Sequence, residues 1–169
     1  MMRVGIGYDS HRFASSRPLI LGGVTIPYPR GLAGHSDADA VAHALADAML
    51  GAVSLGDIGR MFPDTDPAYK DADSIALLAR VHRRIHDEGW TLQQSDITVI
   101  AEAPKLASHV GAMQACLASA LGVDATAISI KSKTNEGMGF IGRAEGIAVL
   151  AVVTMVPGAE EEPVTEGFS

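Results

Sequence analysis

Hydrophobic and polar positions alternate along some stretches of the chain and recur every three or four residues along others. Alternation and β-branched residues, bounded by glycine or proline, predict extended segments at residues 3–8, 18–28, 95–102, 128–134 and 146–156. Apolar residues at helical spacing predict helices over residues 36–54, from 73 or 74 to 89, and over 105–121. Residues 56–67 are predicted to be a loop, and a glycine-rich turn is expected before the last strand.

The order of these segments is β, β, α, α, β, α, β, β. There are too few strands for a doubly wound sheet, so the order favours an α+β sandwich in which helices cover one face of a sheet. The opposite face is then available for contact between subunits. Residues 146–153 form a continuous apolar run, so a strand here would be apolar on both faces, which predicts burial on both sides. We expect a single catalytic domain, residues 1–157, and a disordered acidic tail, residues 158–169.

The first predicted helix carries an unusual polar stripe. Ser36 is the expected N-cap, with Asp39 in the first turn. Asp39, His43 and Asp47 are four residues apart, so they share one helix face. The opposite face should pack in the core and consists of Val41, Leu45, Ala48, Met49 and Val53. Packing gives no reason for His43, which is therefore a candidate metal ligand. His35 precedes the first turn, where free backbone N–H groups attract anions, and this predicts a phosphate site.

Asp9 and His11 provide the other candidate ligands. They are two residues apart at the end of a predicted strand, so both side chains point to the same side. With His43 they form a set of one carboxylate and two imidazoles, which is typical of a catalytic zinc site with one open position. Taken alone, a solvated strand end is the better interpretation of Asp9 and His11. Together with His43 and His35, the metal site is favoured.

Other candidate motifs have more than one interpretation. His82 and His86 are four apart on a predicted helix, but a solvated face is preferred because no third ligand is near in sequence. Residues 137–142 match G-x-G-x-x-G, but a strand follows instead of the helix that a dinucleotide site needs. Phosphate binding by these glycines and Arg143, and a plain turn, are equally supported.

Three further segments combine charges at strand ends or in loops. Residues 131–136 suit phosphate binding, with Glu136 available for a hard cation such as magnesium, although a solvated strand end is an alternative. Lys105 begins a predicted helix, where an anion site competes with a structural turn. Asp57 and Asp64 could accept hydrogen bonds from a polyol. Phosphate-binding features at several loops of a chain with net charge −7 favour a polyphosphate ligand that metal ions neutralise.

Composition excludes several classes of protein. The chain has 169 residues, 47% of them hydrophobic, and its net charge of −7 argues against nonspecific nucleic-acid binding. A single cysteine, Cys116, excludes an intrachain disulfide and fits a reducing compartment. No basic segment precedes an apolar run at the N-terminus, and the longest apolar run is too short to span a bilayer. A cytoplasmic protein without a membrane span is expected.

Several motifs, in order and at matching spacing over residues 3–156, resemble one enzyme family. They are GYDSH (7–11), GGVTIP (22–27), HSDAD (35–39) with His43, GDIG (56–59) with FPDTD (62–66), and GFIGRAEG (139–146). This set resembles the 2-C-methyl-D-erythritol 2,4-cyclodiphosphate synthase family of the non-mevalonate isoprenoid pathway. The resemblance implies a phosphorus–oxygen lyase that cyclises 4-(cytidine 5'-diphospho)-2-C-methyl-D-erythritol 2-phosphate and releases CMP. One alternative is a metal-dependent phosphohydrolase acting on a nucleotide diphosphate, and another is a non-enzymatic trimeric binding module for nucleotides or isoprenoid diphosphates.

The resemblance also implies an architecture and a set of site residues. It implies a ferredoxin-like α+β fold in a homotrimer, active sites between neighbouring subunits, and an axial cavity for an isoprenoid diphosphate. Zinc would be held by Asp9, His11 and His43, and a second cation, Mg²⁺ or Mn²⁺, by Glu136. His35 and Thr134 match transition-state-stabilising positions. Substrate positions are Ser10, Ser36, Asp57, Ile58, Gly59, Phe62, Asp64, Asp66, Phe140 and Arg143. Nucleotide positions are Ala101, Pro104, Lys105, Leu106, Ala107, Lys133 and Thr134. Lys133 and Asn135 depart from the family, where threonines are common.

Overall fold

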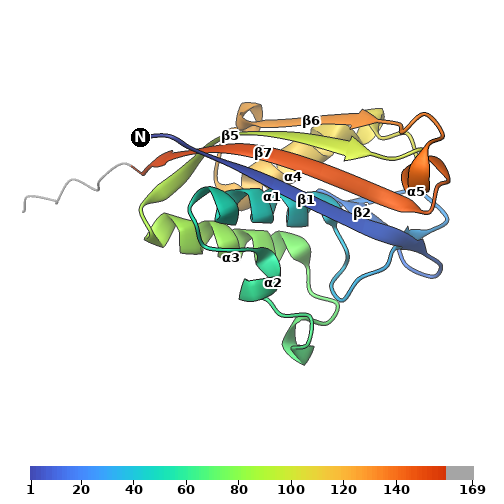
Figure 1. Ribbon diagram of the computed structural model, residues 1–169, viewed down its shortest axis with the longest axis horizontal. Helices are drawn as coiled ribbons and strands as arrows, with labels where there is room; N and C mark the ends of the chain where they lie inside the picture. Colours follow the sequence, from blue (N-terminus) through green and yellow to red (C-terminus); the bar gives the residue numbers. More distant parts are fainter. Residues whose placement is uncertain (159–169) are drawn as a thin grey trace, which may run out of the picture.

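A five-stranded mixed sheet forms one layer of the protein (Figure 1). The computed structural model describes residues 1–158. The strand order is β4 (Gly31–Leu32), β1 (Arg3–Ala14), β7 (Gly146–Pro157), β5 (Trp90–Ile100) and β6 (Ile128–Lys133). Only β5 and β6 run parallel; the other neighbours are antiparallel. The predicted extended region 18–28 is a hairpin of β2 (Leu19–Leu21) and β3 (Val24–Ile26), which turns at the glycines noted in the sequence.

Helices form the second layer, on one side of the sheet (Figure 1). The long ones are α1 (Ala40–Ala52), α3 (Ser74–Asp87) and α4 (Val110–Leu121). The short helices are α2 (Ile58–Met61) and α5 (Gly139–Gly142), and the 3₁₀ turns are η1 (Pro67–Tyr69), η2 (Ala107–His109) and η3 (Ala125–Ala127). The prediction of an α+β fold with one covered face is confirmed. No helix among residues 1–158 is both long and apolar enough to cross a membrane.

The connectivity differs in detail from the ferredoxin-like pattern. The main elements follow the order β1, α1 with α3, β5, α4, β6, β7, whereas the ferredoxin-like order is β-α-β-β-α-β. The second crossover, through α4, brings β6 parallel to β5, and parallel neighbours need such a crossover. The expected layers are therefore present, but the chain passes through them in another order.

Two glycines of β1 allow α1 to lie directly on the sheet. A Cβ atom at Gly5 would be 1.9 Å from the carbonyl oxygen of Ala48, and one at Gly7 would be 1.9 Å from that of Ala44. Any side chain at either position would push the helix away. This confirms the close backbone approach that the alternating glycines of the first strand indicate.

The other face of the sheet carries exposed apolar side chains. They are Val4, Ile6 and Tyr8 of β1, and Leu150 and Val152 of β7; Ile6 is 69% exposed. The prediction that the last strand is buried on both sides is therefore wrong for the single chain, because helices cover only one of its faces. An uncovered apolar face of this kind is typical of a contact surface.

Several element boundaries also differ from the prediction. The N-cap of α1 is Asp39, whose carboxylate accepts the N–H groups of Val41 and Ala42, and not Ser36. Helix α4 begins at Val110 instead of residue 105, because a 3₁₀ turn precedes it. The predicted helix from 73 or 74 is confirmed as α3, with Asp73 as its N-cap. The acidic tail was predicted for residues 158–169, and all of it except Gly158 lies outside the described residues.

Candidate metal centre and adjoining pocket

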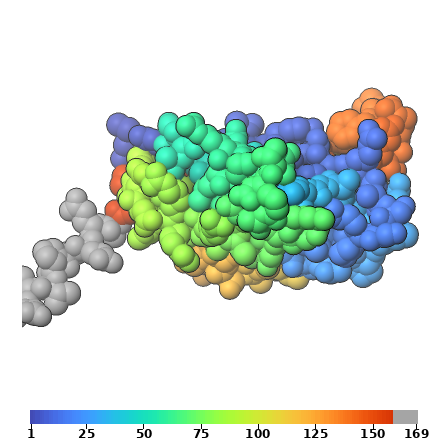
Figure 2. Space-filling view, turned by 90° about the horizontal axis from the view of Figure 1, so that it is seen from below, coloured from blue at the N-terminus to red at the C-terminus, as the bar shows by residue number. Residues whose placement is uncertain are grey.

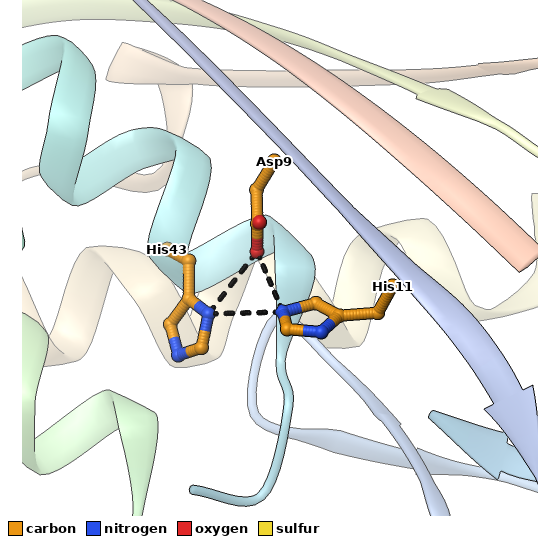
Figure 3. A group of neighbouring side chains, drawn as sticks. All are labelled: Asp9, His11 and His43. Atoms are coloured by element: carbon orange, nitrogen blue, oxygen red, sulfur yellow. Dashed lines mark hydrogen bonds and ion pairs between the residues drawn. The ribbon is translucent and has the colours of Figure 1, made fainter. Parts of the chain in front are cut away.

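Asp9, His11 and His43 converge on one point between β1 and α1 (Figure 3). Asp9 Oδ2 lies 2.8 Å from His11 Nε2 and 3.1 Å from His43 Nδ1. The two ring nitrogens are 3.3 Å apart. Among the described residues, this is the one cluster of three or more histidine, cysteine or acidic side chains close enough to hold a metal ion together.

The sequence explains this convergence through the period of a strand. Gly5 and Gly7 face α1, so Asp9 and His11, at the next odd positions of β1, point to the same side. Ala48 lies over Gly5 and Ala44 over Gly7, so the helix runs antiparallel to the strand and brings His43 toward Asp9. The glycines that let the helix approach thus also set the spacing of the candidate ligands.

The geometry suits a divalent ion with tetrahedral ligands. A tetrahedron with zinc–ligand bonds of about 2.05 Å has edges of about 3.3 Å. The three observed separations, 2.8, 3.1 and 3.3 Å, are close to this length. The side chains are only partly exposed, 22% for Asp9, 18% for His11 and 14% for His43, so the fourth side can open to a ligand. The residue types and the geometry therefore fit a metal site.

Electrostatics in the cluster favour an anionic Asp9 carboxylate beside a more basic His11 ring. Burial alone would raise the pKa of Asp9, but hydrogen bonds and charge from His11 and His43 outweigh it and lower the pKa well below its usual range. Burial alone would lower the pKa of His11, but Asp9 outweighs it and raises the pKa above the ordinary value. His11 Nδ1 lies 2.7 Å from the carbonyl oxygen of Ala33, which fixes that nitrogen as a donor and leaves Nε2 for the cluster.

A cavity of about 280 Å³ opens beside the cluster. It lies between the segment that precedes α1 and the segment that joins α1 to α3; Figure 2 shows these two parts of the chain side by side on this face. Its lining includes the predicted residues His11, His35, Ser36, His43, Ile58, Gly59, Phe62 and Asp64. The structure therefore places half of the predicted substrate positions, together with His35, beside the candidate metal ligands.

Other predicted substrate residues lie elsewhere or have local roles. The Asp57 carboxylate caps α2 through the N–H of Arg60, and the Asp66 carboxylate caps η1. His35 Nε2 lies 3.1 Å from the Asp66 carbonyl oxygen. Ser10 and Phe140 line a second, smaller cavity, on the other side of His11. Arg143 forms an ion pair with Glu145, at 2.7 Å.

The predicted nucleotide residues form a separate group at the ends of β5 and β6. The N–H of Ala101 donates to the carbonyl oxygen of Lys133, and the Glu102 carboxylate accepts the N–H of Asn135. Thr134 donates to Glu136, and both side chains are exposed. Leu106 is buried in the core, with 2% of the residue exposed. Within residues 1–158, no hydrogen bond or ion pair joins this group to the metal cluster.

The backbone N–H groups at the start of α1 are not free, whereas the prediction of an anion site there assumed that they were. Asp39 is fully buried and its carboxylate accepts four backbone N–H groups, those of Gly22, Gly23, Val41 and Ala42. The N-terminus of the helix is therefore occupied by a carboxylate of the protein itself. Asp47, the third member of the polar stripe, accepts the N–H of Ile58 and so ties α1 to α2. Neither aspartate belongs to the metal cluster.

Sequence patterns did not indicate every residue of the site. Tyr69 and Leu77 line the cavity, and Tyr69 packs edge-on against Phe62 with ring centroids 5.2 Å apart. Ser74 lies 2.8 Å from His43 Nε2, although the sequence indicates it only as the start of a helix. The Ser74–His43 contact joins residues 31 apart, which local periodicity does not report.

Comparison with known proteins agrees with this geometry. The YgbB family matches residues 2–156. The 2-C-methyl-D-erythritol 2,4-cyclodiphosphate synthase of Moorella thermoacetica is 56% identical over 155 residues, covering 92% of this chain and 95% of the relative. That of Gemmatimonas aurantiaca is 53% identical, covering 92% and 94%.

Solved structures show the same fold. One of the bifunctional IspDF from Campylobacter jejuni superposes with a TM-score of 0.89 at 45% identity, covering 92% of this chain; this chain spans 42% of that longer protein. A 2C-methyl-D-erythritol-2,4-cyclodiphosphate synthase solved with CDP has a TM-score of 0.83 at 38% identity, covering 91% of this chain and all of that one. The chain therefore belongs to the YgbB family, whose matching curated members are 2-C-methyl-D-erythritol 2,4-cyclodiphosphate synthases, lyases of isoprenoid biosynthesis.

Proposed function

We propose that this enzyme closes the cyclodiphosphate ring of 4-(cytidine 5'-diphospho)-2-C-methyl-D-erythritol 2-phosphate. In this reaction the 2-phosphate attacks the β-phosphorus of the substrate's own diphosphate, and CMP leaves. The observation that supports this function most is that Asp9, His11 and His43 converge beside a cavity that five of the predicted substrate residues line. The similarity to a synthase solved with CDP supports a CDP-linked substrate.

The proposed roles follow from the negative charge of the two phosphate groups that react. Two anionic groups have to approach each other, and the attacking phosphate needs no base because it is already an anion. Asp9, His11 and His43 would hold a zinc ion, which supplies Lewis-acid stabilisation of the diphosphate when bound. His35 lies in the same cavity and would donate to the phosphate on which charge develops. Glu136 would hold the second cation, Mg²⁺ or Mn²⁺.

Substrate folding would account for much of the rate. A cavity that holds both ends of one molecule converts the attack into a step with an effective molarity of about 10⁵–10⁸ M. Phe62 is almost fully buried and packs against Tyr69, so packing holds this wall of the cavity in place. Asp64 on the same wall would accept hydrogen bonds from the erythritol hydroxyls, together with Ile58 and Gly59 backbone contacts.

The complete site would require more than one subunit. The predicted nucleotide residues and Glu136 form one group, and the metal cluster with its cavity forms another. We expect a homotrimer in which the uncovered apolar face of the sheet is the contact and each site combines the two groups from neighbouring copies. Phe140, near that face, keeps its expected role in substrate binding, and an isoprenoid diphosphate in the axial cavity stays a prediction.

The reaction product tests this function. The purified enzyme is incubated with the CDP-linked substrate, Zn²⁺ and Mg²⁺, and phosphorus NMR follows the products. A cyclic diphosphate and CMP in equal amounts are expected. A ring-free erythritol phosphate would instead identify the phosphohydrolase alternative. Tight binding of the substrate without CMP release at any metal concentration would contradict both enzymatic functions.

A further inference from the structure

A polar network lies behind His43, on the side away from the metal cluster; its Ser74 is buried and its Asp37 is partly buried. His43 Nε2 is 2.8 Å from Ser74 Oγ, and Ser74 Oγ donates in turn to Asp37 Oδ1. Asp37 Oδ2 accepts the backbone N–H of Ser74, at 3.1 Å. We propose that Ser74 and Asp37 are positioning residues that hold His43 in the tautomer whose Nδ1 lone pair faces the metal site. The inference rests on the metal site of the proposed function.

The direction of each hydrogen bond follows from what each group can do. A carboxylate only accepts, so the hydroxyl proton of Ser74 must point to Asp37. Ser74 Oγ then offers only lone pairs to His43, so His43 Nε2 must carry the proton. In a neutral imidazole the other nitrogen is then bare. That nitrogen is Nδ1, which lies 3.1 Å from Asp9 and 3.3 Å from His11.

Burial makes this arrangement hard for water to replace. Ser74 is fully buried, and Ser36 is 8% exposed. Ser36 Oγ lies 3.3 Å from Ser74 Oγ and 3.2 Å from His43 Nε2, and it accepts the N–H of Ala38, so it is a second hydroxyl oxygen beside His43 Nε2. Carboxylate-linked partners of a metal-bound histidine fix its ring, and removing them costs about 10–100-fold in metal affinity.

The same contacts also support a purely structural role, because Ser74 is the first residue of α3. A structural role predicts that loss of the hydroxyl affects folding alone. A positioning role predicts a change in the protonation pattern of His43 and in metal affinity while the fold stays intact. The experiment must therefore measure the ring itself, in metal-free and metal-loaded protein.

Ser74→Ala is compared with Ser95→Ala, a matched control. Ser95 is also a buried serine, but its hydroxyl has no hydrogen-bond partner. Zinc affinity is measured by competition with a chromogenic chelator, and thermal unfolding checks the fold. We expect Ser74→Ala to bind zinc about 10-fold or more weakly, Ser95→Ala to bind it as the wild type does, and Ser74→Thr to recover most of the affinity. Equal affinities of Ser74→Ala and wild type would overturn the proposal.

The tautomer is read directly from ¹⁵N chemical shifts of labelled histidine in the metal-free protein, at about pH 8.5 where free imidazole is neutral. The wild type should show a proton on His43 Nε2, and Ser74→Ala should show a mixture of both tautomers. Asp37→Asn provides a variant that keeps the buried hydroxyl, and Asp73→Asn is its control at the same helix end, since Asp73 caps α3 without touching Ser74 Oγ. An unchanged tautomer in both Ser74→Ala and Asp37→Asn would refute a positioning role, whatever the enzyme's activity.

Discussion

The ring nitrogens His11 Nε2 and His43 Nδ1 face each other at 3.3 Å, with a carboxylate oxygen of Asp9 beside them. His11 uses its other nitrogen as a donor to the carbonyl oxygen of Ala33. His11 Nε2 can therefore act as an acceptor, as can His43 Nδ1 in the tautomer proposed above, and the carboxylate is a third acceptor. Three lone pairs at this spacing repel one another unless a cation or a proton lies between them. The arrangement of these three groups therefore favours a positive charge at this point.

Removal of one ligand should abolish tight zinc binding. In His43→Ala two ligands remain on β1, and we expect zinc affinity to fall by more than about 100-fold, with a larger loss of kcat/KM for ring closure. The control is His86→Ala, because His86 is an exposed histidine of α3 outside the metal cluster. Bound zinc is measured by atomic absorption after dialysis. A His43→Ala variant that is zinc-free and fully active would contradict the proposed metal role.

Protons should compete with the metal for His11 at a higher pH than they would for an isolated histidine. Asp9 raises the pKa of His11 above its ordinary 6.5 despite the opposing effect of burial. Metal binding needs the neutral ring, so zinc affinity should already decline as the pH falls toward and below neutrality. In Asp9→Asn the raising effect is lost, so the pH at which affinity declines should move down, while affinity at high pH is lower than in the wild type. Chelator competition between about pH 5.5 and 8.5 measures both changes.

The sequence predicts the large elements because each one has a clear period. Alternating glycines in β1 and apolar spacing in α1 and α3 locate the sheet, its covering helices and the side to which Asp9 and His11 point. Helices α2 and α5 have four residues each, and one turn has no measurable period. Leu150 and Val152 are exposed in the single chain. Their exposure could not be predicted, because an apolar pattern does not indicate which face of the sheet the helices cover.

The candidate ligands could be predicted because Asp9 and His11 lie in one strand and His43 stands out on an alanine-rich helix. The role of Asp39 could not. Its spacing from His43 indicates a shared polar face, whereas the structure turns its carboxylate to the glycines of the β2–β3 turn. That contact depends on how α1 packs against a distant hairpin. The cavity wall formed by Tyr69 and Leu77 likewise exists only after α3 packs beside α1.

Asp39 should therefore be essential for stability instead of catalysis. In Asp39→Ala four backbone N–H groups lose their acceptor, and we expect a loss of about 3 kcal/mol or more in the free energy of unfolding. Asp73→Ala removes the exposed cap of α3 and should cost about 1 kcal/mol. Urea denaturation followed by circular dichroism measures both. Equal losses in the two variants would show that the contacts of Asp39 with Gly22 and Gly23 add nothing.

The uncovered face of the sheet should be the contact between subunits. Ile6 is at the centre of the exposed apolar positions of β1, flanked by Val4 and Tyr8. A buried glutamate without a partner is costly, so Ile6→Glu should dissociate the assembly. Ala76→Glu, on the exposed side of α3, is the control. Light scattering after size exclusion should give a trimer for the wild type and Ala76→Glu, and a monomer for Ile6→Glu; a wild-type monomer would contradict the proposed assembly.

If each active site combines groups from two neighbouring copies, two inactive variants should restore activity in a mixture. His43→Ala damages the metal group, and Glu136→Ala damages the group at the ends of β5 and β6. In trimers formed at random from equal amounts, about one quarter of the interfaces would join an intact metal group to an intact Glu136. After co-refolding, we expect about one quarter of wild-type CMP release from a mixture whose components are inactive alone.

A second mixture separates this explanation from simple mutual stabilisation. His43→Ala and Asp9→Asn both damage the metal group, so no pairing of these two variants contains an intact one. Their mixture should stay inactive even though mixed trimers form to the same extent, as native mass spectrometry can measure. Recovery in this control would show that the mixed chains only stabilise one another. No recovery with Glu136→Ala when mixed trimers are present would mean that each chain holds a complete site. The separation of the metal cluster from Thr134 and Glu136 within one chain would then have another cause.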